Sequence, residues 1–235
     1  ARGRAGPPPP WAGRGGWGHG GQLVREGGVD LRLGTAISGF VPGDSATAVV
    51  LADGSRLEAD VVVVRIGGRP DLCWLADTGL DLTDGVRCDA SGRVLGLDGV
   101  WALGDMASWA DAETGVRHRF EHWASTSDQA GVVARAIVGA EAPPSSVPYV
   151  WSDQFGLKIQ MIGRPDLGHS VEQLQGEGLA GGPIKGTVVG YFAADELVGV
   201  AGFGAPRHIM RYRAPLLGRA ARAEVRALAA AIASP

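Results

Sequence analysis

Three short motifs hold the residues best suited to chemistry: Gly104-Asp105, Glu121-His122-Trp123 and the stretch 151–154, which reads WSDQ. Asp105 follows the apolar run 100–103, where an unpaired charge at the tip of a buried strand would be costly. A glycine at a strand end allows close backbone approach, and a carboxylate accepts hydrogen bonds from sugar or polyol hydroxyls. Asp105 is therefore a candidate ligand contact, with a helix cap or a solvated loop residue as the alternatives.

The other two motifs stand at the start of predicted elements. Residues 122–139 predict a helix, because four apolar residues share one face and Gly139 ends the pattern. The free N–H groups and the positive dipole end of such a helix stabilise partial negative charge on a ligand beside His122 and Trp123. Trp151 opens a predicted strand after a proline-rich linker; a core position is its alternative role.

Two apolar runs predict the strands that would position these motifs. Residues 61–64 are four valines, which favours a strand buried on both faces, and Gly67-Gly68 and Pro70 then let the chain turn sharply. Residues 100–103 predict a second such strand. A strand that leads into Gly-Asp at the carboxyl edge of a sheet is a common ligand-binding position in α/β folds.

The remaining pattern predicts a mixed chain. We expect strands over 29–34 and 35–41, a hairpin within 47–64, and a short helix from Asp71 to about Thr78 that Gly79 ends. Beyond a linker at 141–148, strands are followed by helices without βαβ alternation, which predicts a small α+β domain. The strands are expected within 149–163, 168–175 and 185–204, and the helices at about 205–217 and 219–233.

Composition narrows the class of protein. The chain has 235 residues, 45% hydrophobic and 20% charged, as in ordinary globular proteins. A net charge of -3 gives no sign of a nucleic-acid or membrane partner, and no apolar run has the length of a spanning helix or a signal peptide. We therefore expect a cytoplasmic protein.

Metal and thiol chemistry are not expected. Cys73 and Cys88 form no close pair, which excludes a disulfide scaffold and a CxxC redox centre. The histidines show no i, i+4 pairing, so a zinc site is not predicted. Residues 1–21 are rich in Gly, Pro and Arg and predict a disordered tail; a polyproline ligand for a partner domain is the alternative.

The order of five segments resembles a known family. They read VVVVRIGGRP, LDGVWALGDMA, EHWASTSDQAGVVARAIVG, VPYVWSDQFGLKIQMIG and GAPRHIMRYRAPL. From about Gln22 to about Leu217 the chain is similar to the C-terminal portion of the FAD-dependent NAD(P)H:ferredoxin reductases of oxygenase systems, the putidaredoxin and rhodocoxin reductase type. The resemblance implies an α/β fold: part of a glutathione-reductase-like flavoprotein with two dinucleotide-binding domains, plus a C-terminal α+β domain.

The resemblance also implies domain limits. Residues 22–97 would be part of the NAD(P)-binding domain, 98–147 the C-terminal segment of the FAD-binding domain, and 148–235 the C-terminal reductase domain. The implied cofactors are FAD and NAD(P)H, and the implied partner is a [2Fe-2S] ferredoxin. The oligomeric state and the choice between NADH and NADPH stay open.

Residue roles follow from the same resemblance. Gly104 and Asp105 would contact the ribityl chain of FAD, and Trp123 would lie by its backbone at the pyrimidine end of the flavin. Trp151 would lie beside the flavin and nicotinamide rings, with Glu121 and His122 near the same place. The pair Gly67-Gly68 would face the nicotinamide. No side chain would act as acid or base, because the protein supplies position and electrostatics.

The sequence also departs from the family. The family's two nucleotide-binding motifs, each an apolar strand followed by GxGxxG, are not found upstream of the similar region: the glycine-rich stretch 13–21 has the spacing, but no apolar strand precedes it. We therefore expect this polypeptide alone to bind FAD weakly or not at all. The alternative function is then a non-catalytic remnant or interaction module. A disulfide reductase is a third possibility, but it needs a redox-active cysteine pair. Three arginines, Arg207, Arg211 and Arg213, could meet an acidic ferredoxin or belong to a solvated helix face.

Overall fold

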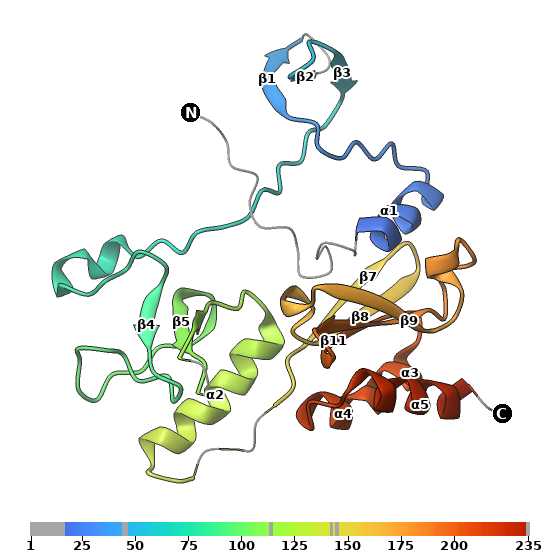
Figure 1. Ribbon diagram of the computed structural model, residues 1–235. Helices are drawn as coiled ribbons and strands as arrows, with labels where there is room; N and C mark the ends of the chain where they lie inside the picture. Colours follow the sequence, from blue (N-terminus) through green and yellow to red (C-terminus); the bar gives the residue numbers. More distant parts are fainter. Residues whose placement is uncertain (1–16, 44–46, 113–114, 142, 144–145, 234–235) are drawn as a thin grey trace.

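A computed structural model describes residues 17–43, 47–112, 115–141, 143 and 146–233. Three sheets organise this described part of the chain (Figure 1). Two have three strands each, and the third is a five-stranded antiparallel sheet that belongs to the C-terminal part of the chain. The overall class is the mixed α/β arrangement that the sequence predicts.

The first sheet is a meander of short antiparallel strands. Its strands are β1 Ile37–Pro42, β2 Thr47–Leu51 and β3 Arg56–Ala59. Gly54, at φ +85°, closes the turn between β2 and β3, and Asp53 accepts a hydrogen bond from the Ser55 N–H at 2.9 Å. The predicted hairpin is confirmed. Residues 29–34 form no strand, which corrects that prediction, because no described segment pairs with their backbone.

The predicted buried strand at 61–64 is also wrong. Val61, Val63 and Val64 are 77%, 84% and 61% exposed, and Ile66 is 80% exposed. The segment is extended but makes no ladder with any described strand. Valine runs favour a strand through side-chain packing on a pleated surface, and a strand forms only where neighbours supply both that packing and the backbone partners.

The second sheet and a helix make the middle unit. Strand β4 Val86–Cys88 pairs in parallel with β5 Ala107–Ala110, which pairs antiparallel with β6 Arg117–His118. The helix α2 Trp123–Ile137 confirms the predicted helix at 122–139. The short 3-10 helix η2 Cys73–Thr78 confirms the predicted turn of helix: Asp71 accepts from the Cys73 N–H at 3.1 Å, and Gly79 ends it at φ +73°.

The run at 100–103 is not the buried strand that its composition predicts. Trp101 makes one isolated bridge with Arg93, Val100 is exposed, and the chain then enters the 3-10 turn η3 Gly104–Met106. The physical reason is that its backbone is paired on one edge only: the Val94 N–H donates to the Val100 oxygen and the Ala102 N–H to the Gly92 oxygen, whereas no described strand lies along the other edge.

The C-terminal unit is an antiparallel sheet covered by helices. Strand order is β7-β8-β11-β10-β9, and Figure 1 shows α3, α4 and α5 together on one side of the sheet. The core between the sheet and these helices contains Phe192, Val200, Ile209, Tyr212 and Val225, among others. The bounds are β7 Tyr149–Gln154, β8 Leu157–Gly163, β9 Ser170–Gln175, β10 Val188–Ala193, β11 Glu196–Phe203, α3 Pro206–Ile209, α4 Arg213–Leu217 and α5 Arg222–Ala233. The predicted succession of strands and then helices is confirmed.

The other face of this sheet carries α1 Trp17–Glu26. Leu23 of α1 is 4% exposed and lies in the same apolar cluster as Met161, Tyr191 and Phe203 of the sheet. Residues 17–21 are therefore helical rather than part of a disordered tail; residues 1–16 lie outside the described residues. Three glycines in this helix cost roughly 1 kcal/mol each against alanine, a cost that burial of Leu23 offsets in part.

Candidate functional site

The Gly104-Asp105 turn is fixed to α2 by its backbone. The Gly104 N–H donates a 2.7 Å hydrogen bond to Oε1 of Gln129, and both residues are buried. Gly104 has φ +76°, a conformation that other residues rarely adopt, and a Cβ there would meet the Thr126 side chain at 3.4 Å. Thr126 and Gln129 are three residues apart on one face of the helix, so that face holds the turn.

The Asp105 side chain takes no part in the contacts that hold the turn. Its side chain is exposed and makes no hydrogen bond or ion pair with any described residue. Its backbone oxygen accepts a 3.0 Å hydrogen bond from Nη1 of Arg119. The carboxylate is thus neither a helix cap nor part of an ion pair, and it can accept hydrogen bonds from a ligand.

Arg119 links this turn to the second motif. Its Nη1 donates to Glu121 as well as to the Asp105 carbonyl, and its Nε lies 3.5 Å from Oδ1 of Asp84. The Arg119 side chain is only 16% exposed. Glu121 therefore has an arginine partner beside the Asp105 turn.

The start of α2 lies beside the same turn. His122 is the N-cap residue, with φ -137° and ψ 136°, and its side chain makes no capping hydrogen bond. Burial lowers the pKa of His122, while the nearby charges of Asp105 and Glu121 act in the opposite direction; the net shift is downward, which favours a neutral imidazole. The Trp123 side chain, in contrast, is 78% exposed.

Trp151 is a surface ring rather than a core residue. It lies on β7, is 39% exposed, and stacks on Tyr149 with 5.5 Å between ring centroids. The Lys158 ammonium lies 6.0 Å from the Trp151 centroid. One face of this indole is therefore supported by the sheet, which decides against the core position that the sequence left open.

Helix α2 joins the three motifs, because it contacts both η3 and β7. A hydrogen bond of 3.3 Å between Ser146 and Asp128 also ties the linker before β7 to α2. Gly67 and Gly68 are not packed against other residues as the three motifs are. Both are exposed, and a Cβ at either would meet no atom within 4 Å. The structure brings 104–105, 121–123 and the strand of Trp151 to one helix, and it gives the two glycines no packing partner.

Two residues of this arrangement were not predicted from the sequence. Gln129 and Arg119 hold the turn, although neither can touch a ligand through the groups they use for that purpose. Gln129 stands four residues before the buried Val133, so a polar residue on the apolar face of the predicted helix was the available signal. Arg119 gives no such signal, because its partners come from three separate segments.

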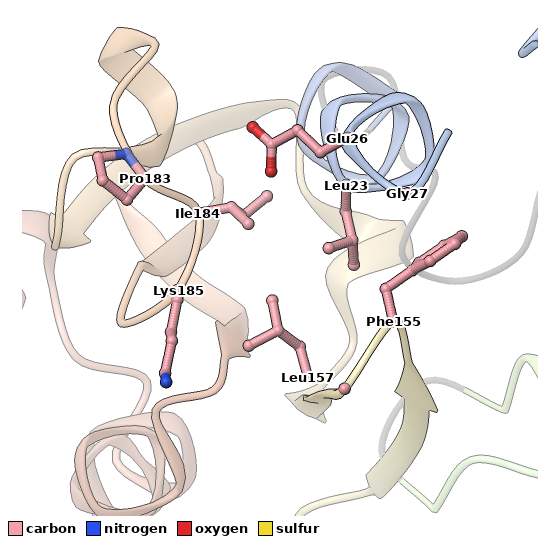
Figure 2. A pocket seen from close by; sticks show the side chains of 9 residues that line it. Leu23, Glu26, Gly27, Phe155, Leu157, Pro183, Ile184 and Lys185 are labelled. Atoms are coloured by element: carbon pink, nitrogen blue, oxygen red, sulfur yellow. The ribbon is translucent and has the colours of Figure 1, made fainter. Parts of the chain in front are cut away.

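The pocket in Figure 2 lies elsewhere. It has a volume of about 470 Å³ and opens between α1 and the C-terminal sheet, where Leu23 faces Leu157 and Ile184. Glu26 and Lys185 are the charged side chains on its wall, and it shares no residue with the three motifs. It is a gap at the contact between α1 and the sheet rather than part of the candidate site.

Other chemistry is little represented among the described residues. Cys73 is exposed and Cys88 is buried, and both are free; burial raises the pKa of Cys88 to about 11, so its thiol is not a nucleophile near neutral pH. In the same residues, no group of three or more His, Cys, Asp or Glu side chains has a metal-binding arrangement. Nor does any described helix have the length and hydropathy needed to span a membrane.

Comparisons with known proteins give two family matches. Residues 21–130 match the family described as pyridine nucleotide-disulphide oxidoreductase, and residues 149–233 match the family described as reductase C-terminal. The residues between the two matches, 131–148, comprise the second half of α2 and the linker that precedes β7.

Curated relatives and solved structures agree with these matches. The ferredoxin reductase component of chlorobenzene dioxygenase from Cupriavidus sp. (strain PS12) is 36% identical over 141 residues, 60% of this chain and 34% of that protein. A ferredoxin–NAD(P)(+) reductase from Sphingomonas sp. is 37% identical over 59% of this chain and 34% of its own length. The covalent putidaredoxin reductase–putidaredoxin complex matches with a TM-score of 0.78 and 23% identity over 97% of this chain and 55% of that one. The chain thus spans about a third of the length of these curated relatives, and the structural match shows the fold.

Proposed function

We propose, from the premise that this chain belongs to the pyridine nucleotide-disulphide oxidoreductases in their ferredoxin reductase branch, that it acts in electron transfer from NAD(P)H through FAD to a [2Fe-2S] ferredoxin. The acceptor would serve an oxygenase or a cytochrome P450. The relatives' names support the reaction class, and the unpartnered carboxylate of Asp105 on its fixed turn is the observation in this chain that carries the proposal.

The donor and acceptor set around α2 fits the middle of a flavin. Asp105 offers a carboxylate to the ribityl hydroxyls, and its turn is held by Gln129 so that ligand binding does not have to order it. The uncapped N–H groups at the start of α2 offer hydrogen-bond donors and a positive dipole end to the pyrimidine edge. Trp151 would offer its exposed face to the rings.

FAD, when bound, would supply the chemistry of accepting a hydride and releasing single electrons. The chain's own residues would bind and orient. His122 would remain neutral beside the flavin because burial lowers its pKa, so it adds no competing positive charge to the helix start. Glu121, paired with Arg119, would not act as an acid or base.

The proposal retains the domain limits of 22–97 for the NAD(P) part, 98–147 for the FAD segment and 148–235 for the reductase domain. The family match that begins at 149 supports the last of these limits. Gly67-Gly68 remains the proposed nicotinamide edge. A ferredoxin is proposed to meet the exposed Arg207, Arg211 and Arg213, and the cytoplasmic location expected from the sequence remains part of the proposal.

The test is flavin binding by the purified chain. FAD is titrated in while flavin absorbance and fluorescence are recorded, and NADH- or NADPH-dependent reduction of a dye and of a plant-type ferredoxin is then measured. Asp105→Asn is expected to weaken FAD binding by roughly 10- to 100-fold, the loss of a hydrogen bond to a charged group. Asp98→Asn, an exposed aspartate of the same unit, is the matched control and is expected to leave the affinity unchanged.

An interaction module that does not retain FAD is the second candidate. The exposure of Val61, Val63 and Ile66 supports it, since such a patch marks a contact surface. No measurable FAD binding by a folded wild-type chain would favour this candidate over the reductase.

A further inference from the structure

A cation–π contact joins the middle unit to the C-terminal sheet. The guanidinium carbon of Arg164 lies 5.5 Å from the ring centroid of Phe120. Phe120 belongs to the segment between β6 and α2, immediately before Glu121, His122 and Trp123. Arg164 follows the end of β8, the strand that pairs with β7 and sets Trp151 opposite Gln160. One contact therefore connects the elements that carry Trp123 and Trp151.

The segment before α2 has two different sides. Arg117 donates to the backbone oxygens of Cys88 and Ser108, and Arg119 donates to that of Asp105, so these alternate residues face the middle unit. His118 and Phe120 lie between them in sequence, with their rings 5.9 Å apart. Successive side chains of an extended chain point to opposite sides, so His118 and Phe120 face the C-terminal sheet.

The Arg164 side chain is held in one orientation. Its Nε and Nη2 donate to the two carboxylate oxygens of Asp166 at 2.9 and 2.7 Å, and it is only 20% exposed. Burial acts to raise the pKa of Asp166, but the hydrogen bonds and charge of Arg164 outweigh it and hold that pKa below its usual value. A planar guanidinium bound in this two-pronged way offers a fixed face to an aromatic ring.

The backbone that carries Arg164 is packed closely against β11. Its N–H donates to the Val198 oxygen at 2.6 Å. A Cβ at Gly163, which has φ +78°, would come within 2.5 Å of that same oxygen, and a Cβ at Gly199 would come within 2.6 Å of the Pro165 nitrogen. The turn after β8 is thus set directly against β11.

We propose that Arg164 is a positioning residue for the candidate site. Oriented by Asp166, it holds Phe120 and so fixes Glu121-His122-Trp123 relative to Trp151. This assignment rests on the proposed function in so far as Trp123 and Trp151 flank a flavin. A contact that only buried surface would not require a guanidinium held flat by two hydrogen bonds to Asp166. A contact that positions the Phe120 ring does require it.

The experiment uses the full chain labelled with 5-fluorotryptophan, observed by fluorine NMR without added flavin. Tryptophan-to-phenylalanine variants assign the Trp123 and Trp151 resonances. Arg164→Gln and Phe120→Leu are expected to shift the Trp123 resonance in the same way, and the double variant is expected to add no further shift, because both remove one contact. Arg164→Lys is expected to resemble Arg164→Gln, whereas Phe120→Tyr, which keeps the ring, is expected to resemble the wild type.

The matched control is Arg226→Gln, which breaks another two-pronged arginine–carboxylate pair, with Glu172, in the same C-terminal unit. It is expected to leave both resonances in place. An unchanged Trp123 resonance in folded Arg164→Gln would overturn the proposal, as would a Phe120→Tyr spectrum like that of Phe120→Leu.

Flavin titration of the same samples separates the two proposals. A Trp123 response without any FAD binding supports the positioning contact and favours the interaction module over the reductase. FAD binding with no Trp123 response in Arg164→Gln supports the reductase function and contradicts the positioning contact.

Discussion

The Gly104 N–H donates its hydrogen bond to Gln129, a residue 25 positions further along the chain, on the helix that also begins with Trp123. A single helix therefore supports the aspartate turn along its body and offers its open amino end beside that turn. The position of Asp105 and the position of the helix start cannot vary independently.

Replacement of Gln129 tests this relationship. Gln129→Leu leaves a buried backbone N–H without its partner, which is expected to cost about 1–3 kcal/mol of unfolding free energy. Denaturant unfolding followed by circular dichroism measures it. The control is Ala130→Gln on the exposed side of α2, which is expected to change stability by less than about 0.5 kcal/mol. Equal losses in both variants would contradict the assigned role.

The second prediction concerns Gly199 of β11, which lies against the turn after β8. Gly199→Ala would press a methyl group against the Pro165 backbone, and the structure lacks space for it. Overpacking of this kind is expected to cost about 1–3 kcal/mol, measured as a lower thermal midpoint. Gly39→Ala is the control, because a Cβ there meets nothing within 4 Å. A Gly199→Ala chain as stable as wild type would show that β11 and the turn can separate.

Acid stability should depend on Glu172. The hydrogen bond from Arg226 is the largest influence on this carboxyl, and with help from Arg222 it holds the pKa of Glu172 below its ordinary 4.5 despite burial. A depressed folded-state pKa contributes stability above the unfolded value, and this contribution is lost as the pH falls through the folded-state value.

Glu172→Gln is therefore expected to be less stable than wild type at pH 7, with the difference shrinking below about pH 4.5. Thermal midpoints measured between pH 3 and 7 give the two curves. Parallel curves for the two proteins would refute the prediction.

The exposed position of Val63 predicts that a charged side chain is tolerated there. Val63→Lys replaces a side chain that is 84% exposed, so the unfolding free energy is expected to change by less than about 0.5 kcal/mol while solubility rises. Light scattering and denaturant unfolding test both parts. Val188→Lys, at a fully buried position, is the contrasting variant and is expected to prevent folding. A clear stability loss in Val63→Lys would mean that residue 63 has a packing role in solution.

Sequence reasoning predicted the elements whose stabilising contacts are local. The 3-10 helix η2 was predictable from Asp71, whose carboxylate accepts from the Cys73 N–H, and from Gly79, and α2 was predictable from its apolar face and Gly139. The C-terminal strands and helices were predictable because their alternation and helical periodicity lead to one shared core.

The predictions at 61–64 and 100–103 were wrong for a common reason. The four valines and the run VWAL are residues that pack well in a buried sheet. Their composition does not indicate whether neighbouring strands are present to pair with them. The burial of Leu23 against a sheet far away in sequence was equally invisible, because a helix containing several glycines has little intrinsic tendency to form.

For the candidate site, the sequence supplied candidate residues but not the residues that hold them in place. Asp105, His122 and Trp151 were identified from residue type and position, and their predicted contacts with FAD remain predictions. Arg119 and Arg164 act through partners brought together by the fold, so no local pattern marks them.

Among the described strands, β7 is at the edge of its sheet and pairs with β8 alone. A residue on an inner strand cannot move without disturbing two ladders and the core on both faces, whereas the ring of Trp151 is anchored on one side alone. Small changes in the turns beside β7 can therefore shift that ring while the folded domain keeps its stability. In this architecture, the adjustable part of the site and the part that keeps the protein folded are carried by different strands.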